Sequence, residues 1–250
     1  MQGKGLAAVV LAAGKGTRMH SDLPKVLHPL GGRPLLLHVL DGLCPLAPER
    51  VAVVVGYQSD RVRQAVPDGS VEFVEQTEQL GTGHAVQQAE AALSEFDGDV
   101  LILCGDMPLI RPETLQNLIA RHRESAAACT LLSLKSKEKK DFGRVIRTPD
   151  GRVDRIVENK DATPQEKTVD EYNSGVYCFQ KSILFKALKG VDNRNAQQEY
   201  YLTDTIARIN QEGLAVEAIQ TSDASELIGI NSLEDLVAAE RLFSQRASNP

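Results

Sequence analysis

Short apolar runs alternate with longer segments of helical spacing through the first half of the chain. The first run, residues 6–12, is continuous and has no polar residue within it, which is typical of a parallel strand buried on both faces. The runs fall at residues 6–12, 51–55, 71–75 and 100–104. Between them, apolar residues recur at helical spacing after Pro34, over 83–93 and from Pro112 to about Arg123. This order predicts an α/β fold with a mostly parallel sheet and right-handed helical crossovers.

The pattern changes after about residue 125, where strand-like runs are separated by loops instead of helices. These runs fall at 129–134, 144–147, 153–158 and 176–179. Thr148-Pro-Asp-Gly is a turn sequence and predicts a hairpin between the second and third runs. We therefore expect a small antiparallel lobe over the parallel sheet. The last predicted elements are a helix over 199–210, a strand over 215–219 and a helix over 233–243 that Asn231 caps.

Composition narrows the class of protein. With 250 residues and 42% hydrophobic content, the chain suits one large α/β domain, with or without an added lobe. The net charge of −6 argues against sequence-independent binding to nucleic acid, which needs a basic face. No apolar stretch approaches the length of a membrane span. The four cysteines are scattered, so we expect free thiols in a reducing cytoplasm and no zinc site.

A glycine loop follows the first apolar run. Residues 11–25 read L-A-A-G-K-G-T-R-M-H-S-D-L-P-K, so Gly14 and Gly16 lie beside three cations, Lys15, Arg18 and Lys25. Glycines let the backbone approach a ligand, and successive N–H groups can form an anion-binding concavity. The pattern is neither a P-loop nor a complete dinucleotide fingerprint, because Met19 stands at the third glycine position. It favours a site for a nucleoside triphosphate, and a plain strand-to-helix turn is the alternative.

Asp106 directly follows the fourth predicted strand and Gly105. Ligands of open α/β sheets bind beyond the carboxyl ends of the strands, so Asp106 and the glycine loop should face one crevice. A carboxylate beside a triphosphate is repulsive unless a cation lies between them, and Mg²⁺ shares hard oxygen ligands with phosphates. Asp106 is therefore a candidate metal ligand; a residue in a solvated turn is the alternative.

A third segment, E-Q-T-E-Q-L-G-T-G-H-A at 75–85, precedes a predicted helix. The amides of Gln76 and Gln79 each offer a donor and an acceptor, as recognition of a pyrimidine demands. Gly81 lets its backbone approach a base, and Thr82 adds a hydroxyl. A surface loop is the alternative, because these residue types are common in loops.

Taken together, these strings resemble a known family. The first loop through Pro24 and Lys25 is similar to the signature of sugar nucleotidyltransferases, and the 75–85 segment resembles the uracil-reading loop of bacterial N-acetylglucosamine-1-phosphate uridylyltransferases. The resemblance implies a Rossmann-like nucleotide-diphospho-sugar transferase fold. It implies catalytic roles for Arg18 and Lys25. The nucleotide-binding residues that it implies are Leu11, Ala12, Ala13, Gly14, Gly16, Thr17, Gln76, Gln79, Gly81 and Thr82.

Later segments extend the resemblance to almost the whole chain. They read F-G-R at 142–144, V-E-N-K-D-A at 157–162, Y-N-S-G at 172–175, N-A-Q-Q-E-Y-Y-L-T-D at 195–204 and G-I-N at 229–231. The resemblance implies that Asp106 and Asn231 are ligands of Mg²⁺. The sugar-phosphate residues that it implies are Gly143, Glu158, Asn173, Tyr201 and Thr203. Cys104 departs from the pattern, because the family usually has tyrosine there, which puts the shape of the pocket in doubt.

The implied reaction is transfer of UMP from UTP to N-acetylglucosamine 1-phosphate, giving UDP-N-acetylglucosamine and pyrophosphate. We expect one nucleotidyltransferase domain over residues 1–250, with a nucleotide-binding core to about 125 and a sugar-phosphate part over about 126–230. We expect none of the hexapeptide repeats that perform acetyl transfer in the bifunctional members. Three alternatives remain. The first is a nucleotidyltransferase of the same fold that uses CTP, another phosphate acceptor or molybdopterin. The second is a non-catalytic binding module, and the third is an NAD-dependent oxidoreductase.

Overall fold

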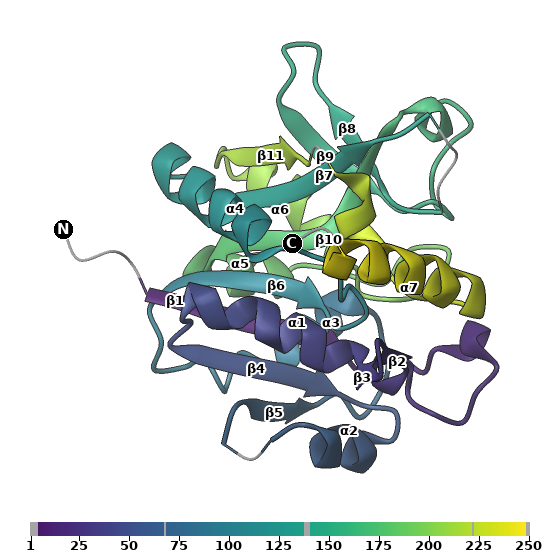
Figure 1. Ribbon diagram of the computed structural model, residues 1–250. Coiled ribbons are helices and arrows are strands. Elements are labelled where there is room, and N and C mark those ends of the chain that lie inside the picture. The colour runs from purple at the N-terminus through teal and green to yellow at the C-terminus, as the bar shows by residue number, and fades with distance from the viewer. Residues whose placement is uncertain (1–4, 68, 138–140, 222, 249–250) are drawn as a thin grey trace.

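A computed structural model describes residues 5–67, 69–137, 141–221 and 223–248. A nine-stranded sheet forms the centre of the molecule, with strand order β11-β7-β10-β6-β1-β4-β5 and the β8–β9 hairpin attached to β10 (Figure 1). Four strands from the first half of the chain run parallel to one another, as the apolar runs predict. Their bounds are Gly5–Ala12 for β1, Arg50–Val55 for β4, Glu72–Glu75 for β5 and Gly98–Cys104 for β6.

The antiparallel part extends this sheet instead of lying over it, which corrects the expected placement of the lobe. Strand β10 pairs antiparallel with both β6 and β7, and β11 runs parallel to β7. Most of β10 is buried, and its apolar side chains alternate between the two cores that lie on opposite faces of the sheet. The bounds are Cys129–Lys135 for β7, Arg144–Arg147 for β8, Val153–Val157 for β9, Glu171–Gln180 for β10 and Val216–Gln220 for β11.

Alternate residues of β1 supply two different cores, which explains its continuous apolar run. Ala7 and Val9 pack with α3, α5 and α6 on one face, whereas Ala8 and Val10 pack with α1, α2 and α4 on the other. In Figure 1, α1 and α4 lie in front of the sheet. The bounds are Leu35–Leu43 for α1, Ser59–Ala65 for α2, Thr82–Gln88 for α3, Pro112–Ser125 for α4, Lys181–Leu188 for α5 and Asp204–Gln211 for α6.

The last helix, α7 (Leu233–Ser248), packs on a small hairpin of β2 (Pro29–Leu30) and β3 (Arg33–Pro34). Its amino terminus is capped by Ser232, whose Oγ accepts from Asp235 N at 3.2 Å, while the Asp235 carboxylate accepts from the backbone N–H groups of residues 231 and 232. The expected cap by Asn231 is therefore wrong, because the Asn231 amide bonds Gly229 O and Lys25 instead.

Two expected helices are shorter than the apolar spacing suggests. The helix expected over 83–93 ends at Gln88, and that expected over 199–210 begins only at Asp204. Helices α2 and α5 lie outside the expected set. None of the helices in the described ranges has both the length and the apolar content needed to cross a membrane. All four cysteines are free thiols, as expected. The division of the chain at about residue 125 into two functional parts stays a prediction.

Candidate active site

The carboxyl ends of the parallel strands meet at one edge of the sheet, where most of the predicted nucleotide residues gather. A cavity of about 260 Å³ opens beside the ends of β1 and β6. The glycine loop and Asp106 thus face one crevice. The cavity is lined by Leu11, Ala12, Ala13, Gly14, Lys25, Val26, Gln76, Gln79, Gly81, Thr82, Ala85, Cys104, Asp106 and Glu199.

Within the glycine loop, the two glycines have different local roles. Gly16 has a φ of +66°, and a Cβ on it would lie 2.6 Å from Lys25 Cβ. It is therefore the residue that lets Lys25 pack against the loop. Gly14 has open space around it, so its backbone is accessible to a ligand. Thr17 and Arg18 follow in a short 3₁₀ helix, Thr17–Met19, and both are exposed outside the lining of the cavity.

Lys25 joins the two predicted metal ligands. Its Nζ donates to Asn231 Oδ1 at 3.1 Å and also forms an ion pair with Asp106 Oδ2. The side chains of Lys25 and Asp106 are only 16% and 12% exposed. Ile230 N donates to Asp106 O at 2.9 Å, which fixes the Asn231 segment beside the end of β6. The side-chain oxygens of Asp106 and Asn231, which are more than a hundred residues apart in the sequence, therefore converge on the ammonium group of Lys25.

The donor set at this point suits Mg²⁺. Asp106 supplies a carboxylate and Asn231 an amide oxygen, both hard ligands. Among the described residues, no three His, Cys, Asp or Glu side chains gather closely enough to hold a metal by themselves. An ion that takes one or two protein oxygens and completes its shell from phosphates and water fits two such ligands. These residues could thus hold Mg²⁺ together with a bound phosphate.

The 75–85 segment is held in shape by its own amides. Gln76, which is 3% exposed, donates from Nε2 to Gly81 O at 3.1 Å and lies 3.0 Å from His84 Nδ1. Gln79 Nε2 donates to Gln76 O at 3.0 Å. The loop is therefore preorganised beside the cavity, which suits a binding role. That these amides read a base stays a prediction.

Residues 199–202 complete this loop, although the sequence pattern suggests a helix for them. Tyr200 N donates to Leu80 O and Gly83 N donates to Tyr200 O, both at 2.7 Å, and Leu202 N donates to Thr82 Oγ1 at 3.1 Å. Glu199 consequently lines the cavity. One feature of the sequence, the G-T-G string at 81–83, does indicate that another segment packs closely against this loop. A Cβ on Gly81 would lie 2.7 Å from Tyr200 O, and a Cβ on Gly83 would lie 2.9 Å from the same oxygen.

Gly81→Ala is expected to disrupt nucleotide binding. Gly81 has a φ of +104°, which costs a residue with a Cβ about 1–3 kcal/mol, and the new methyl would also strike the backbone of residue 200. We expect the KM for a nucleoside triphosphate to rise about tenfold or more, an order-of-magnitude equivalent of about 1.4 kcal/mol. Gly213→Ala is the matched control, because Gly213 has a φ of +72° with open space around it. It should lower the Tm without changing this KM; an unchanged KM in Gly81→Ala would contradict the assignment.

A second cavity, of about 190 Å³, adjoins the first and shares Leu11, Thr82 and Cys104 with it. Four of the five predicted sugar-phosphate residues line this second cavity, namely Gly143, Glu158, Asn173 and Thr203. Tyr201 is the exception: it is 6% exposed, lies outside the lining and donates from its hydroxyl to Asp161 Oδ2 at 3.3 Å. Its position suggests support of the cavity wall and no contact with a ligand.

Burial shapes the electrostatics of the second cavity. It raises the pKa of Glu158, whose Oε1 accepts from Thr203 Oγ1 at 3.0 Å, and the nearby carboxylates of Asp204, Asp161 and Glu199 raise the pKa further. Burial also raises the pKa of Cys104 to about 12, so the thiol stays neutral at physiological pH. The three residues that the two cavities share, Leu11, Thr82 and Cys104, therefore carry no negative charge.

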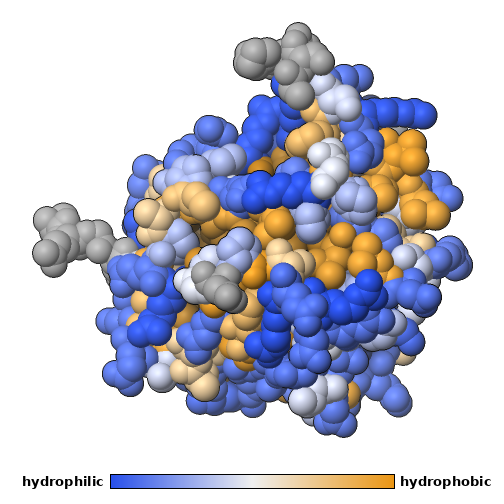
Figure 2. Space-filling model, turned by 60° about the horizontal axis from the view of Figure 1, so that its bottom comes forward, coloured by the Kyte–Doolittle hydropathy of each residue, from blue (hydrophilic) through white to orange (hydrophobic). Residues whose placement is uncertain are grey.

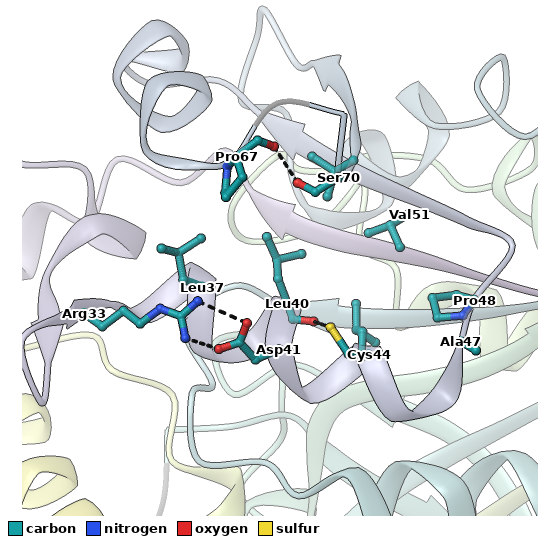
Figure 3. A pocket seen from close by; sticks show the side chains of 12 residues that line it. Arg33, Leu37, Leu40, Asp41, Cys44, Ala47, Pro48, Val51, Pro67 and Ser70 are labelled. Carbon is teal, nitrogen blue, oxygen red and sulfur yellow. Dashed lines mark hydrogen bonds and ion pairs between the residues drawn. The ribbon is translucent and has the colours of Figure 1, made fainter.

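Another cavity, of about 360 Å³, contains none of the predicted site residues. It lies between α1, the start of β4 and the turn after α2, and its walls are largely leucine, valine, alanine and proline (Figure 3). Arg33 and Asp41 form an ion pair at one end, and Sγ of Cys44 donates to Leu40 O at 3.6 Å. Figure 2 shows apolar side chains reaching the surface on the side that is lowermost in Figure 1.

Comparisons with known proteins show the family to which the chain belongs. The model of the MobA-like NTP transferase domain matches residues 8–195. The bifunctional protein GlmU of Geobacter metallireducens is 48% identical over 242 residues, covering 96% of this chain and 51% of the relative. GlmU of Oceanobacillus iheyensis is 45% identical over 239 residues, covering 96% of this chain and 52% of the relative. These relatives confirm the resemblance to one half of a bifunctional bacterial protein.

A solved structure confirms the fold. A UDP-glucose pyrophosphorylase complexed with UDP-glucose superposes with a TM-score of 0.80 at 15% identity, covering 97% of this chain and 99% of that one. The chain spans about half the length of the curated relatives it matches. Because the family model matches three quarters of the sequence, the chain belongs to the family of MobA-like NTP transferase domains.

Proposed function

We propose that this chain transfers UMP from UTP to N-acetylglucosamine 1-phosphate, with Mg²⁺, to give UDP-N-acetylglucosamine and pyrophosphate. The observation that carries the proposal is the pair of cavities that meet at Leu11, Thr82 and Cys104, with Lys25 and Asp106 beside the junction. Two ligands seated in them would meet where the cation-binding oxygens converge. The GlmU relatives support this activity. The four free thiols support a cytoplasmic location.

The chemistry needs positioning more than it needs acid–base groups. An oxygen of the sugar phosphate attacks the α-phosphorus of UTP, a new P–O bond forms, and the bond to the β-phosphate breaks with its electron pair leaving on pyrophosphate. The nucleophile is already an anion at neutral pH, so no general base is required. In-line orientation and neutralisation of charge supply the rate enhancement.

Each polar group of the first loop has a role in this scheme. Lys25 neutralises charge at the phosphoryl centre, and Arg18 with the N–H groups of residues 14–17 binds the departing pyrophosphate. Asp106 and Asn231 would hold Mg²⁺, which would supply the positive charge that offsets the repulsion between the two anions. Gln76 and Gln79 select the base.

Release of pyrophosphate from a panel of substrates tests the proposal. We expect UTP with N-acetylglucosamine 1-phosphate to exceed both UTP with glucose 1-phosphate and CTP with N-acetylglucosamine 1-phosphate by at least about tenfold in kcat/KM, an order-of-magnitude difference of about 1.4 kcal/mol. Equal kcat/KM values with N-acetylglucosamine 1-phosphate and glucose 1-phosphate would contradict the proposed acceptor. The family description favours one other candidate, a MobA-like transfer with a different nucleotide or phosphate acceptor, and greater activity in that arm would select it.

Glu158→Gln is expected to weaken acceptor binding while stabilising the free protein. Because burial raises the pKa of Glu158, the ionised carboxylate is less favourable in the folded protein than in the unfolded chain. Stability is therefore lost as pH rises through the interval between the two pKa values, and the neutral amide should raise the Tm at pH 7.5. Loss of a charged hydrogen-bond acceptor should raise the KM for the sugar phosphate about tenfold.

Glu171→Gln is the matched control for this prediction. Glu171 is also buried, but its bonds with Arg147 and Ser133 outweigh the effect of burial and lower the pKa of the carboxyl. Its ionised form stabilises the fold above the pKa of the unfolded chain, so the amide should lower the Tm and leave the KM unchanged. A Glu158→Gln variant that lowers the Tm or binds the acceptor normally would refute the assignment.

A further inference from the structure

Two short segments supply the oxygens that converge on Lys25, and each segment is six residues long. One runs from Asp106 at the end of β6 to Arg111 at the start of α4; the other runs from Glu226 to Asn231. At the site end they are joined by Ile230 N to Asp106 O at 2.9 Å and by the contacts of Lys25. At the far ends, Glu226 joins its own segment to Arg111, and Asp223, three residues before Glu226, also pairs with the Arg111 guanidinium at 3.1 Å.

The Glu226 carboxylate lies where a helix amino terminus favours an anion. Its Oε2 accepts from Arg111 N at 3.3 Å and from Thr114 Oγ1 at 2.5 Å, and its Oε1 lies 3.5 Å from Arg111 Nε. Arg111 is the N-cap of α4 but makes no capping bond with its own side chain. Glu226 therefore caps α4 from a distant part of the sequence and bonds donors that α4 leaves unpaired.

Burial makes this link firm. Glu226 is 4% exposed, and the neighbouring Leu227 is 3% exposed within the core that also contains Met107 and Ile110. A buried carboxylate that loses its partners is costly, so the segment cannot slide along α4 without breaking these bonds. Fixing one end of each segment limits how far apart the other ends can move.

We propose that Glu226 is a positioning residue that sets the separation of Asp106 and Asn231, and hence the geometry of their cation site. The inference rests on the proposed function for the identity of that cation. It assigns a role in the active site to a residue that lies outside both cavities and contacts no predicted substrate residue.

The first test needs neither metal nor substrate. Hydrogen exchange of the Ile230 amide in the free chain reports whether the two segments stay together, with the Val9 amide of β1 as the reference for global opening. We expect the ratio of the two exchange rates to rise about tenfold in Glu226→Ala and less in Glu226→Gln, which retains one acceptor oxygen. The matched control is Asp99→Asn, because Asp99 is a buried carboxylate bonded to Arg123 of α4 at the opposite end of β6.

The second test measures the Mg²⁺ concentration for half-maximal release of pyrophosphate. It should rise about tenfold in Glu226→Ala with a smaller change in the KM for UTP, recover partly in Glu226→Gln and stay within about twofold in Asp99→Asn. An unchanged exchange ratio, or an unchanged requirement for Mg²⁺ in an active Glu226→Ala variant, overturns the proposal. If the unsubstituted chain releases no pyrophosphate, the proposed function fails, and the exchange ratio alone decides whether Glu226 positions the segments.

Discussion

Replacing Asp106 with alanine is expected to lower kcat/KM for pyrophosphate release by at least about a thousandfold, or about 4 kcal/mol of transition-state stabilisation. Asp106 and Asn231 are the two side chains whose oxygens converge on the Lys25 ammonium, and Asp106 is the charged one. Under the proposed function, its loss would leave two polyanions to approach each other without the divalent ion that would offset their repulsion. Steady-state kinetics with UTP, N-acetylglucosamine 1-phosphate and Mg²⁺ measures the loss directly.

The size of this effect separates a metal ligand from a structural carboxylate. Asp99→Asn removes a charge that is also buried and lies at the start of β6, at the end of the strand opposite to Asp106, so it should cost stability and leave kcat/KM within about threefold. Asp106→Asn keeps a side-chain oxygen but loses the charge, so its kcat/KM should lie between those of Asp106→Ala and Asp99→Asn. Activity of Asp106→Ala within tenfold of the unsubstituted chain would rule out a metal-binding role for Asp106.

Lys25→Met is expected to lower kcat/KM by about a hundredfold to a thousandfold, equivalent to about 3–4 kcal/mol. Methionine preserves the Cβ that packs against Gly16, so the glycine loop should keep its shape. What is lost is the ammonium group that contacts Asp106 and Asn231 and that would neutralise charge at the phosphoryl centre. The loss should therefore appear mainly in kcat.

The control for Lys25→Met is Lys186→Met, which removes an exposed lysine paired with Glu212 on the far side of the sheet. It should leave kcat/KM within about twofold, because exposed ion pairs contribute little. Lys25→Arg keeps the charge but has a longer, planar head group and should restore only part of the rate. Full activity in Lys25→Met would show that the ammonium group serves only to hold Asp106 in the free protein.

Much of the fold follows from the sequence because the parallel strands are buried on both faces. Alternate residues of 6–12 pack into the cores on opposite faces of the sheet, so every position in the run must be apolar. This run predicts the position of β1 to within one residue. The glycines and Asp106 then follow the strand ends, so their gathering at one edge is a matter of topology. The same argument recovers Gln76, which follows β5.

The errors arise where a distant segment decides the local structure. Residues 199–203 have helical composition, but their backbone bonds the loop at 80–83, which no local pattern reveals. Tyr201 consequently donates to Asp161 Oδ2 and lies outside the lining of the second cavity, and its role in binding stays a prediction. Asn231 looks like a helix cap until the adjacent Ser232 and Asp235 take that role. Glu226 belongs to no recognisable motif, because its proposed positioning role depends on contacts with Arg111 and Thr114, more than a hundred residues away in the sequence.

The most direct measurement is a crystal structure of the chain grown with UDP-N-acetylglucosamine and Mn²⁺, with the ion located by its anomalous scattering. The account predicts one peak coordinated by the Asp106 carboxylate and Asn231 Oδ1, in contact with the diphosphate, and Lys25 Nζ displaced from its bridging position. A peak distant from both oxygens, or a diphosphate outside the junction of the two cavities, would contradict it.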